Sequence, residues 1–406
     1  MDELGGAGPG LLIAATVPDT IKAFLLPYAD HFRNSGWRVD AMSSGISARE
    51  DLRSHFDAVY DVNWSRNPLS SGNFAETPER IREIIKDGGY DIIHVHTPVA
   101  SFIMRYATRK IESPSRPKVV YTAHGFHFFR GGGRVRNMIF RRLEKKAGKW
   151  TDRLIVINHE DLEASARYGI VPGERLVYMP GIGLDFSKYD PSSVSHAEIR
   201  RTRDEIGLRS DDSLFTMVAS FDKGKRHEDV IRAMSKIKNP DIHVAFAGNG
   251  PLREKIQLMA RTSLVHHRTH FLGQVKDPRS LMLASKATIM SSEREGLSRA
   301  AMESICLGVP VIGSDARGVR DVIQPRRGLL FPTGDPLALR DAMLQIYDEP
   351  YPRVTPDPEW RIENLIDKHE ALYSVLLEES RRVPEAAIPD SGYDEEIFEA
   401  EMESEE

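Results

Sequence analysis

Cysteine is nearly absent from this sequence, because Cys306 is the only one among 406 residues. A disulfide bond needs two thiols, so none can form within the chain, and packing must hold the fold together. This cysteine usage is typical of proteins in a reducing compartment, and we expect a cytoplasmic protein.

Long hydrophobic runs are absent as well. No window of about 18 consecutive apolar residues occurs, so the sequence predicts no helix that spans a membrane. Residues 1–10 lack the basic segment that opens a secretory signal, and we expect no such signal. Hydrophobic residues still make up 40% of the chain, and this content and length favour two or more packed domains.

Basic residues are absent from the last part of the chain. Residues 383–406 contain ten acidic residues, and leaving these out changes the net charge from −5 to +5. The sequence predicts that this tail is disordered, since so charged a segment cannot bury enough apolar surface. The tail then serves either solubility alone or the regulation of a basic surface elsewhere in the chain.

The rest of the sequence alternates apolar strands with helices, which predicts an α/β fold with parallel sheets covered on both faces. The expected strands form two series, at 11–15, 39–42, 90–96, 118–122 and 154–157, and at 214–219, 243–247, 269–272, 287–290 and 309–312. The expected helices include 21–36, 77–86, 101–111, 299–307 and 361–378. Pro180, Gly181 and Gly183 interrupt the pattern, so we expect two Rossmann-like domains that face a cleft.

The segment from Ser292 to Glu303 carries the most informative chemical pattern. A Gly/Ser turn enters the expected helix, and the free amides and dipole of a helix N-terminus form a seat for phosphate. Glu295 and Glu303 lie on either side of this seat, and carboxylates accept hydrogen bonds from hydroxyl groups. The pattern indicates a nucleoside diphosphate that carries a sugar, although the pair alone is also compatible with ordinary surface carboxylates.

Further motifs lie in order along the chain. They are Ala15-Thr16-Val17, the stretches 90–98, 121–128 and 178–185, the stretch 247–251, and the Glu-x7-Glu segment. From about residue 11 to about residue 382, the chain resembles the family 4 glycosyltransferases of the GT-B fold, in the branch that includes exopolysaccharide-synthesis enzymes. The resemblance implies sugar transfer from a nucleotide donor with retention of anomeric configuration, with no metal and no other cofactor.

A domain division follows from this resemblance and from the interrupted pattern. We expect an N-terminal acceptor-side Rossmann-like domain at 11–182 and a C-terminal nucleotide-sugar donor domain at 183–358. A crossover helix at 359–382 is expected to pack on the N-terminal domain, and the acidic tail follows at 383–406.

The resemblance also assigns roles on the donor side. Glu303 is expected to bind the ribose hydroxyls and Glu295 the hydroxyls of the donor sugar. The amides of Gly296, Leu297 and Ser298 are expected to hold the β-phosphate.

Lys225 matches the family lysine, whose fixed cation stabilises the negative charge that develops on the leaving diphosphate. The family often has an arginine five residues earlier, where this chain has Ser220. Either Lys225 therefore carries the phosphate alone, or Lys223 or Arg226 shares it. A solvated basic loop is the alternative interpretation.

Two further turns are expected to complete the nucleotide pocket. Gly248, Asn249 and Gly250 follow a strand and shape the pocket. Gln274 and Val275 fall where the backbone of family members pairs with the base.

Histidines mark the first half of the chain. The resemblance places His124 near the donor sugar, where it orients the sugar and contributes electrostatically without acting as a nucleophile. We expect His127 to pack like an aromatic side chain. His94 and His96 share one face of a strand, and we expect packing there instead of a metal site, since no third ligand is evident.

Residues 130–150 carry eight basic residues and one acidic residue. The pattern predicts a basic amphipathic helix from about Val135 to Trp150. A positive, apolar surface at 134–150 suits an anionic membrane or a polyprenyl-linked acceptor, at about 1 kcal/mol per basic residue. The alternative is an ordinary helix with a solvated basic face, and no recognition motif indicates nucleic acid.

These features predict a retaining hexosyltransferase that moves a sugar from a nucleotide diphosphate donor, by resemblance a UDP-sugar, to a glycan or lipid-linked acceptor in polysaccharide biosynthesis. We expect it in the cytoplasm or as a peripheral protein at the inner membrane face. The alternatives are transfer to a soluble secondary metabolite and, because of Ser220, a protein that keeps the fold but only binds.

Overall fold

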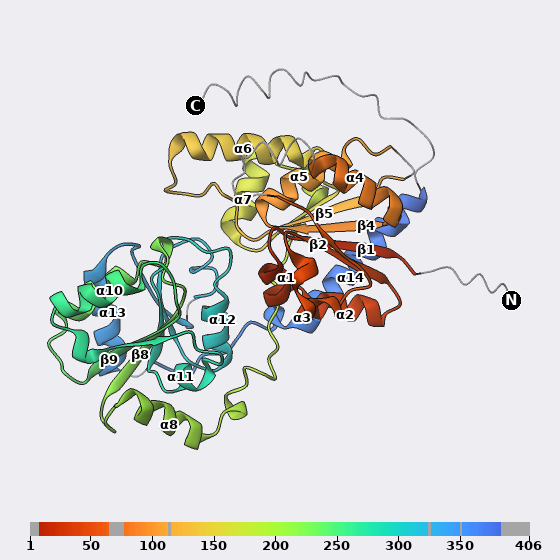
Figure 1. The fold of residues 1–406 in the computed structure, drawn as a ribbon. Helices are drawn as coiled ribbons and strands as arrows, with labels where there is room; N and C mark the ends of the chain where they lie inside the picture. Colours follow the sequence, from red (N-terminus) through yellow and green to blue (C-terminus); the bar gives the residue numbers. More distant parts are fainter. Residues whose placement is uncertain (1–7, 65–76, 113–114, 324–325, 350, 383–406) are drawn as a thin grey trace. The chain divides into compact units, whose positions relative to one another are not determined.

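The structure is a computed structural model that describes residues 8–64, 77–112, 115–323, 326–349 and 351–382. The chain divides into two compact units (Figure 1). Unit 1 contains Met1–Val156, Ala164–Val177 and Ile366–Glu406, and unit 2 contains Ile157–Glu163 and Tyr178–Leu365. The acidic tail at 383–406 lies outside the described residues.

Unit 1 is built on a seven-stranded sheet with the order β3-β2-β1-β4-β5-β6-β7. The strands are β1 (Gly10–Ala14), β2 (Arg38–Ser43), β3 (Val59–Asp61), β4 (Ile92–His96), β5 (Lys118–Ala123), β6 (Arg153–Val156) and β7 (Leu176–Tyr178). Every residue of the neighbouring strands β1 and β4 is buried, as expected for parallel strands with helices on both faces.

Helices cover both faces of this sheet (Figure 1). They are α1 (Pro18–Phe24), α2 (Leu26–Asn34), α3 (Glu50–Arg53), α4 (Thr77–Gly88), α5 (Pro98–Thr108), α6 (Arg134–Gly148), α7 (His159–Tyr168) and α14 (Ile362–Arg382). α5 packs between α4 and α6. α2 meets α14, where the rings of Phe32 and Tyr373 lie 5.0 Å apart. From Ile366 onward α14 is therefore part of unit 1.

The single helix expected at 21–36 is wrong, because the structure has two helices that separate at Leu25. Pro27 is the cause. Proline has no amide hydrogen and its ring clashes with the carbonyl four residues earlier, here that of Ala23. The chain therefore ends one helix and starts a second with Pro27 in its first turn.

Unit 2 contains a six-stranded parallel sheet with the order β10-β9-β8-β11-β12-β13. Its strands are β8 (Ser213–Val218), β9 (Ile242–Ala247), β10 (Thr269–Gly273), β11 (Ala287–Met290), β12 (Val311–Ser314) and β13 (Gly328–Phe331). Its helices are α8 (His196–Ile206), α9 (His227–Lys236), α10 (Arg253–Thr262), α11 (Arg279–Leu283), α12 (Arg299–Cys306) and α13 (Pro336–Asp348).

Two of the hydrophobic clusters in unit 2 pack most of its helices against this sheet. One joins β8 and β9 to α9, α10 and α13 through side chains such as Phe215, Met234 and Met343. The other packs α12 beneath β11 and β12 through side chains such as Met302 and Ile305. Each unit is therefore a Rossmann-like α/β domain, which confirms the predicted fold class.

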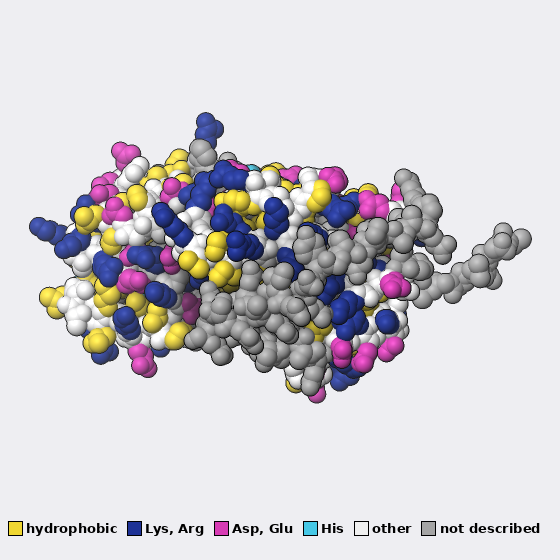
Figure 2. Space-filling view, turned by 90° about the horizontal axis from the view of Figure 1, so that it is seen from above, with side chains coloured by type: hydrophobic (Ala, Val, Ile, Leu, Met, Phe, Trp, Pro, Cys, Tyr) yellow, Lys and Arg dark blue, Asp and Glu magenta, His cyan; other side chains and the backbone are white. Residues whose placement is uncertain are grey.

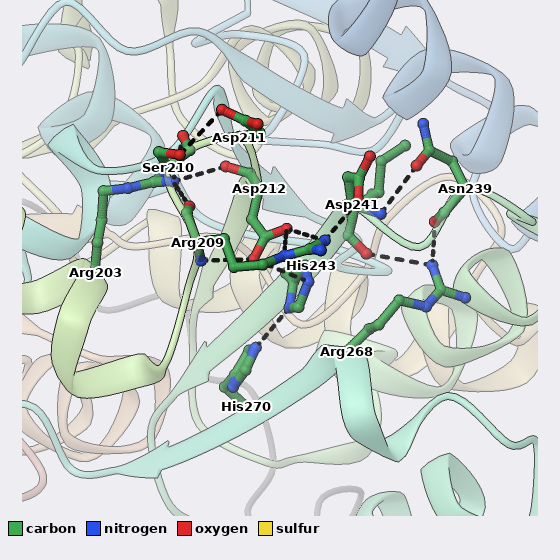
Figure 3. Close-up of polar contacts among 11 residues, drawn as sticks. Arg203, Arg209, Ser210, Asp211, Asp212, Asn239, Asp241, His243, Arg268 and His270 are labelled. Carbon is green, nitrogen blue, oxygen red and sulfur yellow. Dashed lines mark hydrogen bonds and ion pairs between the residues drawn. The ribbon is translucent and has the colours of Figure 1, made fainter.

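The amino-terminal edge of the second sheet carries a polar cluster (Figure 3). His243 Nδ1 and His270 Nε2 are 3.0 Å apart, and Asp212 lies 3.7 Å from the other nitrogen of His243. Arg209 binds Asp212 at 2.8 Å, and Arg268 donates to the carbonyls of Asn239, Ile242 and Ile237. These groups begin β8, β9 and β10, so they lie away from the carboxyl ends where ligands bind in such sheets.

Candidate active site

The candidate donor site lies at the carboxyl edge of the second sheet. β8 is the first strand of this sheet in the chain, with β9 and β10 on one side of it and β11 on the other. Connections after β8 and β11 therefore leave toward opposite faces, and this kind of switch point is where open α/β sheets bind ligands. The loop after β8 carries Lys225 and the loop after β11 carries Glu295.

Hydrogen bonds join these two loops directly. The hydroxyl of Ser291 donates to the carbonyls of Lys225 and Arg226, and the amide of Glu293 donates to the carbonyl of Gly224 at 2.7 Å. Arg226 adopts the left-handed conformation (φ 54°) at the start of α9. The sharp turn there places Lys225 beside the loop that follows β11.

Lys225 and Glu295 form an ion pair, with 2.5 Å between Nζ and Oε1. Ser292 donates a second hydrogen bond to the same carboxylate oxygen at 2.6 Å. Both charged side chains remain partly exposed, so a ligand can reach them. The structure thus brings together the cation and the first carboxylate that the sequence singles out.

Ser220 does not supply a cation, and its hydroxyl donates to Asp222 at 2.5 Å. Arg226 is bound to the buried carboxylate of Asp229 at 2.6 Å, so its charge is already compensated. Lys223 is exposed and forms no ion pair with the residues that the structure describes. Of the basic residues in this loop, Lys225 is the one that faces the carboxylate of Glu295.

The helix α12 begins directly after Ser298, and no side chain caps its N-terminus. The amide of Ser298 donates to the carbonyl of Gly318 at 3.0 Å, so it is not free for the phosphate it was expected to bind. The hydroxyl of Ser298 is buried and has no hydrogen-bond partner among the described residues. An unpaired polar atom in this position is costly unless a ligand satisfies it.

Glu303 lies on the second turn of α12 and is nearly buried, with 8% exposed. Its Oε1 accepts hydrogen bonds from the hydroxyl of Tyr189 at 2.6 Å and from Nε of Arg299 at 2.9 Å. Burial raises the pKa of Tyr189, and the nearby Glu303 charge adds to this rise, so the tyrosine stays a neutral donor. The sequence held no signal for Tyr189, because its contact with Glu303 spans 114 positions.

Backbone hydrogen bonds join the two turns expected to form the nucleotide pocket to each other and to the loop that carries Lys225. The amide of Gly248 donates to the carbonyl of Gly273, and the amide of Phe221 donates to the carbonyl of Asn249. A side chain on Gly248 would lie 2.0 Å from the carbonyl oxygen of Ala219, so only glycine fits this approach. A side chain on Gly250 would lie 2.7 Å from the backbone nitrogen of Phe221, and Gln274 and Val275 follow Gly273 at the end of β10.

His124 directly follows β5, in unit 1. Its Nε2 lies 3.0 Å from Nδ1 of His96, and its ring stacks on Phe24 at 6.2 Å. Burial lowers the pKa of His124 to about 4, so it is neutral near pH 7. A neutral imidazole can donate or accept a hydrogen bond but supplies no charge.

His94 and His96 pack ring to ring at 4.1 Å on β4. His94 contacts the hydroxyls of Tyr373 and Thr122 at 2.5 and 2.7 Å. Burial lowers the pKa of both histidines well below the usual value. His127 packs edge-on against Phe140 at 4.9 Å, as an aromatic side chain would.

The basic helix α6 ends two residues before the predicted Trp150. Its buried residues are Glu144, Ala147 and Gly148, near its carboxyl end. Val135 and Met138, in contrast, are 60% and 37% exposed. Figure 2 shows the face that carries α6, where Lys and Arg side chains gather with hydrophobic side chains between them. Among the described residues, no helix is long and apolar enough to cross a membrane.

Comparisons with solved structures define the class of protein. A glycosyltransferase from Rickettsia africae ESF-5 has a TM-score of 0.75 at 15% identity, covering 92% of this chain and 99% of its own. The Anabaena protein HepE in complex with UDP and glucose has a TM-score of 0.74 at 17% identity, covering 90% of this chain and 100% of its own. The fold is thus that of the GT-B glycosyltransferases.

Sequence comparisons then identify the family. Residues 24–182 match the model of Glycosyltransferase Family 4, and residues 198–359 match the model of Glycosyl transferases group 1. A Bacillus subtilis (strain 168) protein assigned as the glycosyltransferase EpsD is 32% identical over 343 residues, which are 84% of this chain and 88% of that protein. An Escherichia coli UDP-Gal:α-D-GlcNAc-diphosphoundecaprenol α-1,3-galactosyltransferase is 26% identical over 66% of this chain and 69% of its own. The chain therefore belongs to these glycosyltransferases and is an enzyme that transfers a glycosyl group.

Proposed function

We propose that this enzyme transfers a hexosyl group from a UDP-sugar to a lipid-linked glycan acceptor, with retention of anomeric configuration. The observation that carries the proposal is the arrangement at the switch point between β8 and β11. Lys225 and Glu295 pair there, and the same loop leads into the uncapped N-terminus of α12, whose second turn carries Glu303, all within unit 2.

Each group then has a role in the donor complex. The N-terminus of α12 and the hydroxyl of Ser298 hold the β-phosphate, and Lys225 moves from Glu295 to the phosphate oxygens. Glu295 is thereby released to accept hydrogen bonds from the sugar hydroxyls. Glu303, whose side chain is fixed by hydrogen bonds from Tyr189 and Arg299, accepts hydrogen bonds from the ribose hydroxyls.

The chemical step needs no nucleophile from the protein. The bond between the anomeric carbon and the β-phosphate oxygen breaks, and the acceptor oxygen bonds to the same face of that carbon. The proton of the acceptor hydroxyl passes to the departing phosphate oxygen. Lys225 stabilises the charge on the diphosphate, and we assign His124 to orienting the donor sugar as a neutral group.

Relatives and neighbours support the substrate classes. The Escherichia coli relative is a galactosyltransferase with a UDP-Gal donor and a diphosphoundecaprenol-linked acceptor, and the HepE structure contains UDP and glucose. The exposed basic and apolar residues of α6 suit such an anionic, lipid-bearing acceptor. We propose that α6 docks on the anionic face of a membrane, which would make the enzyme peripheral.

The test begins with a thermal-shift screen of the native protein against nucleotide sugars, since a ligand that binds only the folded state raises the melting temperature. With the selected donor, Lys225→Ala is expected to lower the transfer rate by about 100-fold or more, and Glu303→Ala to weaken donor binding. Glu293→Ala is the matched control, because this neighbouring carboxylate is exposed. Normal transfer by both site variants would refute the assignment.

A further inference from the structure

One neighbouring segment, Arg317 and Gly318, binds the backbone of the turn from Glu295 to Ser298. The amide of Glu295 donates to the carbonyl of Arg317 at 2.9 Å, and Nε of Arg317 donates to the carbonyl of Glu295 at 3.2 Å. Both backbone groups of Glu295 are thus bound to a single residue. The amide of Ser298 is bound in the same way by the carbonyl of Gly318.

Gly318 allows this close approach. It has a φ of +72°, and a side chain there would lie 2.5 Å from the carbonyl oxygen of Gly296 and 2.7 Å from that of Glu295. Such distances are well below any normal contact. The two segments are therefore in full contact, with no room for the turn to move backward.

A buried ion pair fixes the guanidinium of Arg317. Its Nη1 lies 3.0 Å from Oδ1 of Asp161, and the two side chains are 4% and 1% exposed. The side-chain amide of Asn158 donates to the carboxylate of Asp161 and to the backbone carbonyl of Gly296, each at 2.9 Å. Residues 157–163 belong to unit 2, although the chain on either side of them belongs to unit 1.

These bonds leave two backbone amides of the turn available to a ligand. With the amides of Glu295 and Ser298 already used, those of Gly296 and Leu297 are the groups of the turn that can face a phosphate. The direction of each amide depends on the carbonyl of the preceding residue, because the two belong to one planar peptide unit that turns as one body. A tilt at the Glu295 or Gly296 carbonyl would therefore turn an amide away from the ligand.

We propose that Arg317, Asp161 and Asn158 are positioning residues that orient the Glu295–Ser298 turn for the β-phosphate of the donor. They touch no substrate and act through the backbone of the turn. The inference rests on the proposed function, because it assumes that a nucleoside diphosphate binds at α12.

The test compares a nucleotide that has a β-phosphate with one that lacks it. UDP and UMP share the base and ribose, so only UDP reaches the turn. In the full-length chain, Arg317→Lys and Asp161→Asn are expected to weaken UDP binding about tenfold, or about 1.4 kcal/mol. UMP binding should change by less than about twofold, as measured by titration calorimetry.

The control separates positioning from general destabilisation. Arg105 and Glu144 form a comparably buried ion pair in unit 1, at 2.9 Å. Glu144→Gln should lower the melting temperature yet leave the ratio of UDP to UMP affinity unchanged. Asn158→Ala keeps the Asp161–Arg317 pair and should shift the ratio to a smaller degree, which gives a result even if Asp161→Asn fails to fold.

The outcomes distinguish the two proposals. A native UDP-to-UMP ratio in folded Arg317→Lys and Asn158→Ala would overturn the positioning role. Failure of the unaltered protein to bind either nucleotide, or the diphosphate of any other base, would overturn the proposed function instead.

Discussion

Ser298, at the proposed phosphate site, has hydrogen-bond partners that the sequence pattern does not reveal. Ser298 was expected to contribute an amide, but that amide is used within the protein and its hydroxyl is the unpaired group. A buried hydroxyl without a partner costs about 1–3 kcal/mol. A ligand that accepts a hydrogen bond from this hydroxyl would remove that cost, which agrees with a role for Ser298 in ligand binding.

This leads to a prediction for Ser298→Ala. The variant should be at least as stable as the native protein without ligand, while its affinity for the donor diphosphate falls roughly three- to tenfold, in line with one lost hydrogen bond. Thermal unfolding and calorimetric titration measure the two quantities.

Ser304→Ala provides the contrast. Its hydroxyl donates to the carbonyl of Val309 at 3.0 Å and accepts a bond from Thr288. This variant should lose about 1 kcal/mol of stability and keep native affinity. A stability loss of that size in Ser298→Ala would show that its hydroxyl is satisfied within the protein.

Among the elements, α6 exposes apolar side chains beside its basic ones. Hydrophobic side chains at Val135 and Met138 stay exposed, although the buried pair of Glu144 with Arg105 anchors the other end of the helix. A helix of this kind gains stability when its apolar face enters a lipid interface and its cations meet anionic headgroups.

We predict that the protein co-sediments with vesicles containing anionic lipid, and that about 0.5 M salt weakens this binding because it screens the charges. Reversing two exposed charges of α6, by Arg142→Glu with Lys145→Glu, should reduce the bound fraction severalfold. The same reversal at Arg200 and Arg201, exposed on α8, is the control. Equal binding by both double variants would exclude a role for α6.

Across the whole molecule, buried histidines link stability to pH. Burial, together with the nearby His243, lowers the pKa of His270 to about 4, against a raising effect of Asp212. The pKa of His243 is lowered mainly by burial, with Arg268, Arg209 and His267 adding to the effect. Unit 1 contributes His94, His96 and His124 in the same sense.

The sign follows from proton binding. Unfolded histidines take up protons below about pH 6.5, whereas these folded ones do so only at lower pH, near 4 for His270. Stability is therefore complete above about pH 6.5 and decreases as the pH falls toward 4. We predict a falling melting temperature over this range by calorimetry.

His270→Asn tests how much one of these buried histidines contributes to the pH dependence of stability, since asparagine can hydrogen bond but does not titrate. Its melting temperature should depend less steeply on pH between about 6.5 and 4 than that of the native protein. An unchanged slope would mean that His270 does not contribute to this dependence.

The sequence by itself determined the central strands and the chemistry-bearing loops after them. Parallel strands covered on both faces are buried and mostly apolar, and that signal is strong in β1, β4, β8 and β9. The edge strands β3, β7 and β13 escaped prediction, because at the edge of a sheet pairing with a single neighbour decides the conformation of so short a segment.

Only the tertiary structure decided how the site is held. The ion pair of Lys225 with Glu295, the hydrogen bond from Tyr189 to Glu303 and the ion pair of Arg317 with Asp161 join positions from 70 to 156 residues apart. Periodicity reports on neighbours along a helix or strand, and such distant contacts leave no regular trace in it. The sequence thus named the candidate groups for donor binding, and the folded chain alone fixed their partners and directions.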